Sequence, residues 1–254
     1  MTEKYITYIS NDINFDDIGS ELFKLAVSLS FSINSNKKLA FREGAYTNIL
    51  NIFIKSLNYK LFTIDDYNNL NFKDYKCNNY TNEDNLNLLF IDENNFNHKF
   101  INNDVRNLLS ILIVNNNIYS NLIHTKINNI MNYFGDYDID NYVCINIKKD
   151  LFVPFYYEKA YHHFFPNKKV IILTDDIEWT QMNFNFISKY NIIYIDNNKD
   201  NRFINFILLS TFNNMIIDKN NFSWWCAYLG NKNKKIIVPN NNHNFYLDNW
   251  IRQS

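Results

Sequence analysis

The alternation of short apolar strands with helical patterns in the second half of the chain limits the possible folds most strongly. Runs rich in Ile, Val and Tyr predict β-strands, and the 3.6-residue spacing of apolar residues between them predicts helices. Strands are expected at residues 142–147, 169–173, 192–195, 215–217 and 235–238, and helices at 154–164, 177–190, 202–212 and 223–229. Because parallel strands need crossover connections, this alternation predicts a doubly wound α/β domain. Ligands of such domains bind at the carboxyl ends of the strands, so functional residues are expected directly after them.

The first half of the chain predicts a second α/β domain. A strand at residues 5–9, a helix at 18–33 and a strand at 39–41 form a βαβ unit. Further helices are expected at 47–61, 102–113 and 122–134, a loop at 65–84 and a strand at 86–91. The clearest break is at residues 135–140. We therefore predict an N-terminal domain of residues 1–135 and a C-terminal domain of residues 136–254.

The composition excludes several classes of site. The 254-residue chain has four widely separated glycines, so it contains neither a GxGxxG fingerprint nor a P-loop. A net charge of −1 argues against a nucleic-acid partner. Cys77, Cys144 and Cys226 have no CxxC spacing, which favours a reducing compartment. The adjacent His162 and His163 diverge by about 100° on a helix, so no metal site is expected.

No secretory signal is evident, and no apolar run reaches the roughly 20 residues of a membrane span. We therefore expect a cytoplasmic protein of microbial or viral type. Residues 136–140 contain two DxD triplets, which in one class of transferases hold a metal and a nucleotide diphosphate. Their position before a strand favours a solvated loop instead.

Charged and polar residues follow three of the predicted strands. Two lysines follow 142–147, two aspartates follow 169–173, and a serine-started helix follows 215–217. Lysines neutralise a diphosphate, and a serine at a helix N-terminus offers its hydroxyl and backbone amides to a phosphate. This grouping predicts a nucleotide-diphosphate pocket.

Each of these residues also has a purely structural interpretation. Lys148 and Lys149 fit a solvated surface pair, and the two aspartates fit helix N-caps. Ser223 fits an N-cap, which is compatible with phosphate contact. For Trp224, packing in the core is favoured over a platform for a sugar.

Several segments resemble glycosyltransferase family 11, the α-1,2-fucosyltransferase family. Residues 222–229, Phe-Ser-Trp-Trp-Cys-Ala-Tyr-Leu, are similar to the family's Phe-Ser-Trp-Trp-Gly-Ala-Trp-Leu. Residues 174–179 resemble its Ser-Asp-Asp-x-x-Trp stretch, residues 156–160 its helix opening, residues 17–23 its N-terminal pattern, and residues 248–251 its terminal Trp-Ile. The resemblance is strong from residue 142 onward and faint before it.

The resemblance implies a GT-B-like fold, with two Rossmann-like α/β domains facing a cleft, and GDP-fucose as the donor substrate with no metal or cofactor. It implies that Lys148 stabilises the leaving diphosphate and that Asp176 recognises the nucleotide base. Asp17, in the loop that opens the first predicted helix, is a candidate for the base that the acceptor needs. The residues implied to bind the donor are Asn146, Lys148, Lys149, Asp175, Asp176, Phe222, Ser223 and Trp224.

The chain departs from the family's His-x-Arg-Arg-x-Asp motif, where it reads Asn146-Ile147-Lys148-Lys149-Asp150. Lysine keeps the charge of arginine but loses its two-pronged fork, and asparagine cannot act as an acid or base. The leading hypothesis is an inverting, metal-independent transfer of fucose from GDP-fucose to a glycan hydroxyl. The alternatives are a pseudo-transferase that binds a glycan or partner without turnover, and a transferase for another nucleotide sugar.

Overall fold

The protein is described by a computed structural model that covers residues 5–6, 18–35, 38–42, 60–62, 101–114, 117–164, 166, 168–186, 191–198, 200–230, 233–240 and 246–253. It divides into two compact units, Met1–Leu112 and Ile113–Ser254. The division falls before helix α5 (Asn117–Phe134), whereas the predicted boundary lies after it. Helix α5 belongs to the second unit because it packs against helix α8 (Arg202–Thr211), with the rings of Tyr119 and Phe203 5.4 Å apart.

Unit 1 contains a parallel sheet in which strand β2 lies between β1 and β3. Its elements are β1 (Tyr5–Ile6), α1 (Ile18–Ser35), β2 (Lys38–Arg42), β3 (Lys60–Phe62) and α4 (Asn103–Leu109), and a π-helical turn (Ser110–Val114) follows α4. The succession β1–α1–β2, with the two strands parallel, confirms the predicted βαβ unit.

Helix α1 is held by an apolar face at helical spacing. Leu22, Leu25, Ala26 and Leu29 are fully buried. The N-terminus of α4 is capped by Asn102, whose side chain accepts a hydrogen bond of 2.8 Å from the backbone N–H of Val105. The buried face of each helix therefore follows from its sequence.

Part of the expected organisation of the first half lies outside the described residues. This applies to the loop at 65–84, the strand at 86–91, residues 7–9 of the first strand and residues 47–59 of the second helix. Residues 60–61, which the prediction placed at the end of that helix, belong to strand β3.

Unit 2 is built on a parallel sheet of six strands in the order β6-β5-β4-β7-β8-β9. The strands are β4 (Tyr142–Ile147), β5 (Lys169–Thr174), β6 (Ile192–Asp196), β7 (Asn214–Ile216), β8 (Lys235–Pro239) and β9 (Ile251–Gln253). The helices between them are α6 (Pro154–His162), α7 (Ile177–Asn183), α8 and α9 (Asn221–Tyr228), and 3-10 turns occupy Ile139–Asn141 and Lys149–Leu151. This confirms the doubly wound α/β architecture.

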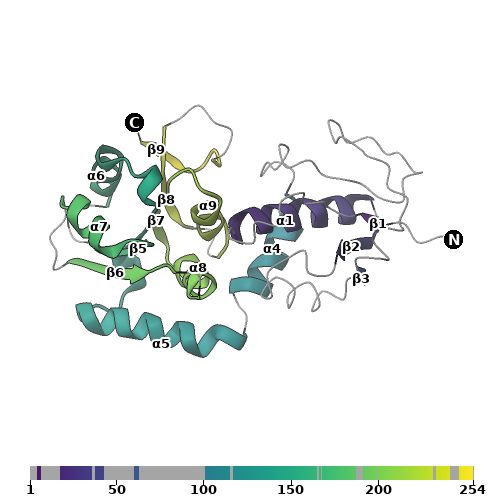
Figure 1. Cartoon of the computed structure of the whole chain (residues 1–254), viewed down its shortest axis with the longest axis horizontal. Helices are drawn as coiled ribbons and strands as arrows, with labels where there is room; N and C mark the ends of the chain where they lie inside the picture. The colour runs from purple at the N-terminus through teal and green to yellow at the C-terminus, as the bar shows by residue number, and fades with distance from the viewer. Residues whose placement is uncertain are drawn as a thin grey trace. The chain divides into compact units, whose positions relative to one another are not determined.

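Helices cover both faces of the sheet in unit 2, as Figure 1 shows. The side chains of Val143, Ile145 and Ile147 join the core beneath α6, where Tyr157 and Ala160 are fully buried. The alternate residues of β4 face the other way, so that Asn146 reaches the side chain of Ser223 on α9. A strand buried on both faces has to be apolar along its whole length, as β4 is apart from Asn146.

Three details of unit 2 differ from the sequence prediction. Helix α7 ends at Asn183 rather than at residue 190, because Phe184 turns into the core and packs against Phe186 at a ring distance of 4.3 Å. Helix α9 begins before Ser223, because Asn220 caps it. Strand β9 was not predicted, since three residues are too few to form a pattern.

We expect Gly230→Ala to destabilise unit 2 far more than Gly135→Ala. Both glycines have positive φ angles, of 80° and 62°, where an added Cβ costs about 1–2 kcal/mol. At Gly230 the Cβ would also collide with the backbone oxygen of Ser210, whereas at Gly135 it meets nothing within 4 Å. Urea denaturation of both variants should show about 1–3 kcal/mol of additional loss at Gly230. Equal losses of stability in the two variants would contradict the close contact between Gly230 and the backbone of Ser210 on α8.

Candidate functional site

The strand order of unit 2 reverses between β4 and β7. From β4 the chain adds β5 and β6 on one side, then crosses to the other side and adds β7, β8 and β9. At such a switch point the connections leave in opposite directions, and a crevice opens outside the carboxyl ends of the two central strands. The residues at this position are those that follow β4 and β7, beginning with Lys148 and Ile217.

A buried carboxylate, Asp218, follows strand β7 at this position. The residue is 3% exposed, and one of its oxygens, Oδ1, accepts a hydrogen bond from the side chain of Asn220. Burial raises the pKa of Asp218 from 3.8 to about 6, although the hydroxyl of Ser223 and the charge of Lys148 lower it. Asp218 was not among the predicted site residues. The sequence signal for this residue is an acidic side chain that directly follows a buried apolar strand at the switch point.

Two tyrosines of α6 lie near this carboxylate. The hydroxyl of Tyr156 donates to the backbone oxygens of Ile217 and Ile237, at 2.6 Å and 3.1 Å, and so ties α6 to the ends of β7 and β8. Tyr157 is fully buried, and its hydroxyl has no hydrogen-bond partner among the described residues. Burial raises the pKa of both phenols, and the charge of Asp218 contributes to the shift. Both phenols are therefore neutral at physiological pH.

Side-chain amides form a buried network on the opposite face of the sheet. The amide of Asn146 donates to the hydroxyl of Ser223 at 3.1 Å and accepts from Asn197 at 3.5 Å. Asn205 donates to the side chain of Asn197 at 3.3 Å. Asn146 is 2% exposed, so the network ties the end of β4 to α8 and α9 from within.

The prediction that Ser223 starts a helix is wrong. Asn220 is the N-cap, and its side chain accepts a hydrogen bond of 2.7 Å from the backbone N–H of Ser223. Ser223 is fully buried, so its hydroxyl and its N–H are both engaged within the protein. Phe222 and Trp224 are buried beside it, and the ring of Trp224 stacks on Tyr228 at 4.6 Å. The expected packing of Trp224 in the core is confirmed.

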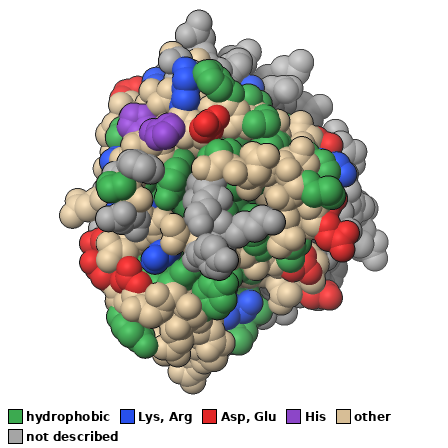
Figure 2. All heavy atoms as spheres, turned by 90° about the vertical axis from the view of Figure 1, so that its left-hand side faces the viewer, with side chains coloured by type: hydrophobic (Ala, Val, Ile, Leu, Met, Phe, Trp, Pro, Cys, Tyr) green, Lys and Arg blue, Asp and Glu red, His purple; other side chains and the backbone are tan. Residues whose placement is uncertain are grey.

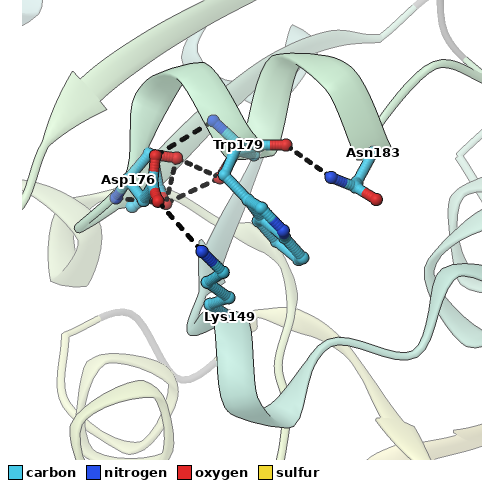
Figure 3. Close-up of polar contacts among 6 residues, drawn as sticks. Lys149, Asp176, Trp179 and Asn183 are labelled. Atoms are coloured by element: carbon cyan, nitrogen blue, oxygen red, sulfur yellow. Dashed lines mark hydrogen bonds and ion pairs between the residues drawn. The ribbon is translucent and has the colours of Figure 1, made fainter.

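The two lysines after β4 have different surroundings. Lys149 lies 3.4 Å from the carboxylate of Asp176 and 5.5 Å from the ring centre of Trp179. Figure 3 shows the side chain of Lys149 pointing toward Asp176. Lys148 is exposed, and its side chain forms no hydrogen bond or ion pair with any described residue. Of the two, Lys148 is the cation that stands beside the switch point and is open to a ligand.

The two aspartates after β5 also differ. Asp176 is the N-cap of α7, and its side chain accepts a hydrogen bond of 3.0 Å from the backbone N–H of Trp179 (Figure 3). Asp175 is exposed. The structure thus brings together Lys149 with Asp176, and Asn146 with Ser223. Asp17 lies outside the described residues.

The DxD triplets of residues 136–140 form local turns. The carboxylate of Asp136 accepts a hydrogen bond from the backbone N–H of Asp138, and that of Asp138 accepts one from Asp140. No group of three metal-binding side chains occurs within the described residues. The expected solvated loop agrees with this geometry, since Asp136 and Asp138 are bound to their own backbone.

The surface in Figure 2 carries no continuous basic area among the side chains drawn in colour on that face. Basic and acidic groups are interspersed there with polar and apolar ones. In the part of the chain that the structure describes, no helix combines the length and the apolar character that crossing a membrane requires.

We expect Asp176→Ala to lose about 1 kcal/mol of stability, because the variant loses the cap of α7. Asp176→Asn retains a capping oxygen and loses only the exposed ion pair with Lys149, which is worth a few tenths of a kcal/mol. Urea denaturation of the two variants separates these contributions. Equal destabilisation by alanine and asparagine would mean that the charge, and not the cap, matters.

We expect Asp218→Asn to stabilise the protein more at high pH than at low pH. Since the folded state raises the pKa of Asp218 to about 6, the proton on this group stabilises the fold below about pH 4, and that contribution is lost as the pH rises through 6. Asparagine does not titrate. The stability difference between variant and wild type should therefore shift by about 2–3 kcal/mol in favour of the variant between pH 4 and pH 8.

Denaturation of both proteins at the two pH values measures this shift. The matched control is Asp200→Asn, which removes an exposed carboxylate from the same unit. A stability difference that does not change with pH would contradict the raised pKa of the buried Asp218.

Comparison with known proteins places the chain in a family. The family model described as glycosyl transferase family 11 matches residues 18–253. Over 108 residues the chain is 29% identical to the O-antigen biosynthesis glycosyltransferase WbnK of Escherichia coli, a match covering 38% of this chain and 35% of that protein. It thus spans about a third of the length of this curated relative.

Among solved structures, the fucosyltransferase NodZ from Bradyrhizobium aligns with 89% of this chain and 93% of its own, at 11% identity and a TM-score of 0.45. The family match, which covers nearly the whole chain, confirms the resemblance found in the sequence motifs. The chain belongs to glycosyltransferase family 11.

Proposed function

We propose that this protein is an inverting, metal-independent glycosyltransferase that moves fucose from GDP-fucose to a hydroxyl of a glycan. The observation that carries the proposal is the switch point of unit 2 in a chain of family 11. There the exposed side chain of Lys148, which forms no ion pair with any described residue, and the first turn of α9 lie at the edge where parallel sheets bind nucleotides.

In this proposal the donor diphosphate binds at the ends of β4 and β7. Lys148 supplies a positive charge that no described carboxylate neutralises by an ion pair. The N-terminal end of α9 adds the positive end of a helix dipole. Lys149, Asp175 and Asp176 follow the neighbouring strand ends and are proposed to contact the nucleoside.

The buried residues among the proposed site residues hold the site in place from the protein interior. Asn146 and Ser223 tie the end of β4 to α9, so they hold the phosphate-binding elements in place. Phe222 and Trp224 anchor the first turn of α9 in the core. Such a rigid second layer of packing keeps a binding site in its working geometry.

The proposed reaction is a displacement at the anomeric carbon of the sugar. The acceptor oxygen forms a new bond to that carbon while the bond to the diphosphate oxygen breaks, and the nucleoside diphosphate leaves. Lys148 stabilises the negative charge that develops on the leaving group. The proton of the acceptor passes to a base, for which Asp17 in the N-terminal domain remains the proposed residue.

The name of the Escherichia coli relative supports a glycan as the acceptor, because that protein is described as an O-antigen biosynthesis glycosyltransferase. A cytoplasmic protein is in keeping with this proposal.

A pseudo-transferase that binds a glycan or partner without turnover is the second candidate. The observation that favours it is the position of Asn146, which replaces the family's histidine and is bonded into the core. A transferase for another nucleotide sugar is favoured by the same residue, because asparagine stands where the family has histidine.

We expect GDP to bind with micromolar affinity, to bind more tightly than UDP or dTDP, and to do so equally well in the presence of EDTA. Lys148→Ala should weaken GDP binding at least about tenfold, since a charge-assisted contact is worth about 1.5–3 kcal/mol. Asp176→Ala should weaken GDP relative to UDP. Isothermal titration calorimetry measures these affinities.

Lys126→Ala is the control for lost charge, because it removes a lysine from helix α5. Absence of nucleotide binding at millimolar concentration would overturn the donor site. Binding of GDP-fucose without transfer to any acceptor, unchanged by Lys148→Arg with Asn146→His, would support the pseudo-transferase. A large gain in turnover from that pair would support a weakened fucosyltransferase.

A further inference from the structure

Two exposed lysines lie at the switch point, one beyond the end of each central strand. Lys148 directly follows β4, and Lys219 lies three residues beyond the end of β7. Neither side chain forms a hydrogen bond or an ion pair with any residue that the structure describes. Lys149 differs from both, because the carboxylate of Asp176 lies 3.4 Å from its ammonium group. Lys148 and Lys219 are therefore two cations of this edge that are available to a ligand.

The register of the sheet places these two lysines opposite each other. Ile145 of β4 pairs with Ile216 of β7. Continued by three residues along both chains, this register sets Lys148 against Lys219. The chain still follows the sheet beyond β7, because the backbone N–H of Ile217 donates a hydrogen bond of 3.1 Å to strand β8. Neighbouring strands lie about 4.8 Å apart, so two lysine side chains at this position can reach one shared ligand.

Burial and electrostatics agree with this placement. The residues just before the two lysines, Ile147 and Asp218, are 1% and 3% exposed, so both chains reach the surface at the same level of the sheet. The charge of Lys148 opposes the rise in the pKa of Asp218 that burial causes, which requires the two chains to be close there. The carboxylate of Asp218 is hydrogen-bonded to Asn220 and Ser223 within the protein, and it forms no ion pair with either lysine.

Two positive charges side by side favour the binding of an anion between them. Like charges at opposed positions of neighbouring strands destabilise a sheet, and a bound anion removes that repulsion. The diphosphate of a nucleotide sugar carries two negative charges, which two lysines balance, and lysine is a common ligand of phosphate. The N-cap of α9 directly follows Lys219, so the positive end of that helix dipole lies at the same place. The charges of this edge therefore match a diphosphate.

Building on the proposed function, we propose that Lys219 is a second cation of the donor site, which binds the diphosphate of the nucleotide sugar from the end of β7 while Lys148 binds it from the end of β4. Together the two lysines neutralise the bound donor. When the bond to the anomeric carbon breaks, its electron pair stays on the diphosphate oxygen, and the same two charges stabilise the leaving group.

Calorimetric titration of GDP into variants of Lys219 tests this proposal. Lys219→Ala should weaken GDP binding at least about tenfold, as expected for one lost charge-assisted contact. Lys219→Glu reverses the charge and should weaken binding by a further factor of about ten, whereas Lys219→Arg keeps the charge and should bind within about threefold of the wild type. The difference between wild type and Lys219→Ala should shrink as salt is added, because salt screens exposed charges.

A purely structural role of Lys219 would not follow the charge of the side chain. Because Lys219 is exposed, urea denaturation should give the same stability for the wild type and all three variants. The control Lys126→Ala removes a lysine from helix α5 and should bind GDP as the wild type does.

The outcomes separate this inference from the proposed function. Unchanged GDP binding by Lys219→Ala and Lys219→Glu, together with weaker binding by Lys148→Ala, would overturn the role of Lys219 and leave the proposed donor site intact. Equal weakening by arginine, alanine and glutamate would also overturn it, because the charge would then not matter. Absence of GDP binding by the wild type at millimolar concentration would overturn the donor site, and this inference with it.

Discussion

Burial of strand β4 on both faces is the constraint on which the rest of unit 2 depends. Its odd-numbered residues pack beneath α6, and Tyr142 and Cys144 are fully buried on the other face. Such a strand has to lie in the middle of a sheet between two layers of helices. The chain meets this requirement by adding strands on one side of β4 and then on the other, and the reversal that results is the kind of edge at which parallel sheets generally bind ligands.

The same packing sets the chemistry of that edge. Where the apolar strands end, their last residues are still covered by α6 and α9, so the polar groups there lie in surroundings of low polarity. Asn146 donates a hydrogen bond to the hydroxyl of Ser223 there, and burial raises the pKa of Asp218 to about 6. A protein that buries a carboxylate in this way loses stability at neutral pH, because the charged form is poorly solvated in the interior.

Much of the fold and part of the site were predictable from the sequence. Strand β4 was predicted with its observed bounds because six consecutive buried residues leave a distinct apolar run. Lys148 was predicted to stand at the ligand-binding edge because its position depends only on where the strand ends. The start of α9 was misplaced because both Asn220 and Ser223 are good capping residues, and only the backbone geometry distinguishes them. Helix α7 was predicted too long because its apolar pattern continues past Asn183, although Phe184 leaves the helix to fill the core.

The sequence by itself determined the alternation of strands and helices, the family motifs, and the charged residues that follow the strands, because these depend on local periodicity and on neighbours in the chain. Only the tertiary structure decided which of those residues meet. Lys149 pairs with Asp176, whereas Lys148 stays open beside Asp218. Burial and the pairing of groups far apart in the sequence set the free energy of each charged group, and neither is encoded in the local pattern.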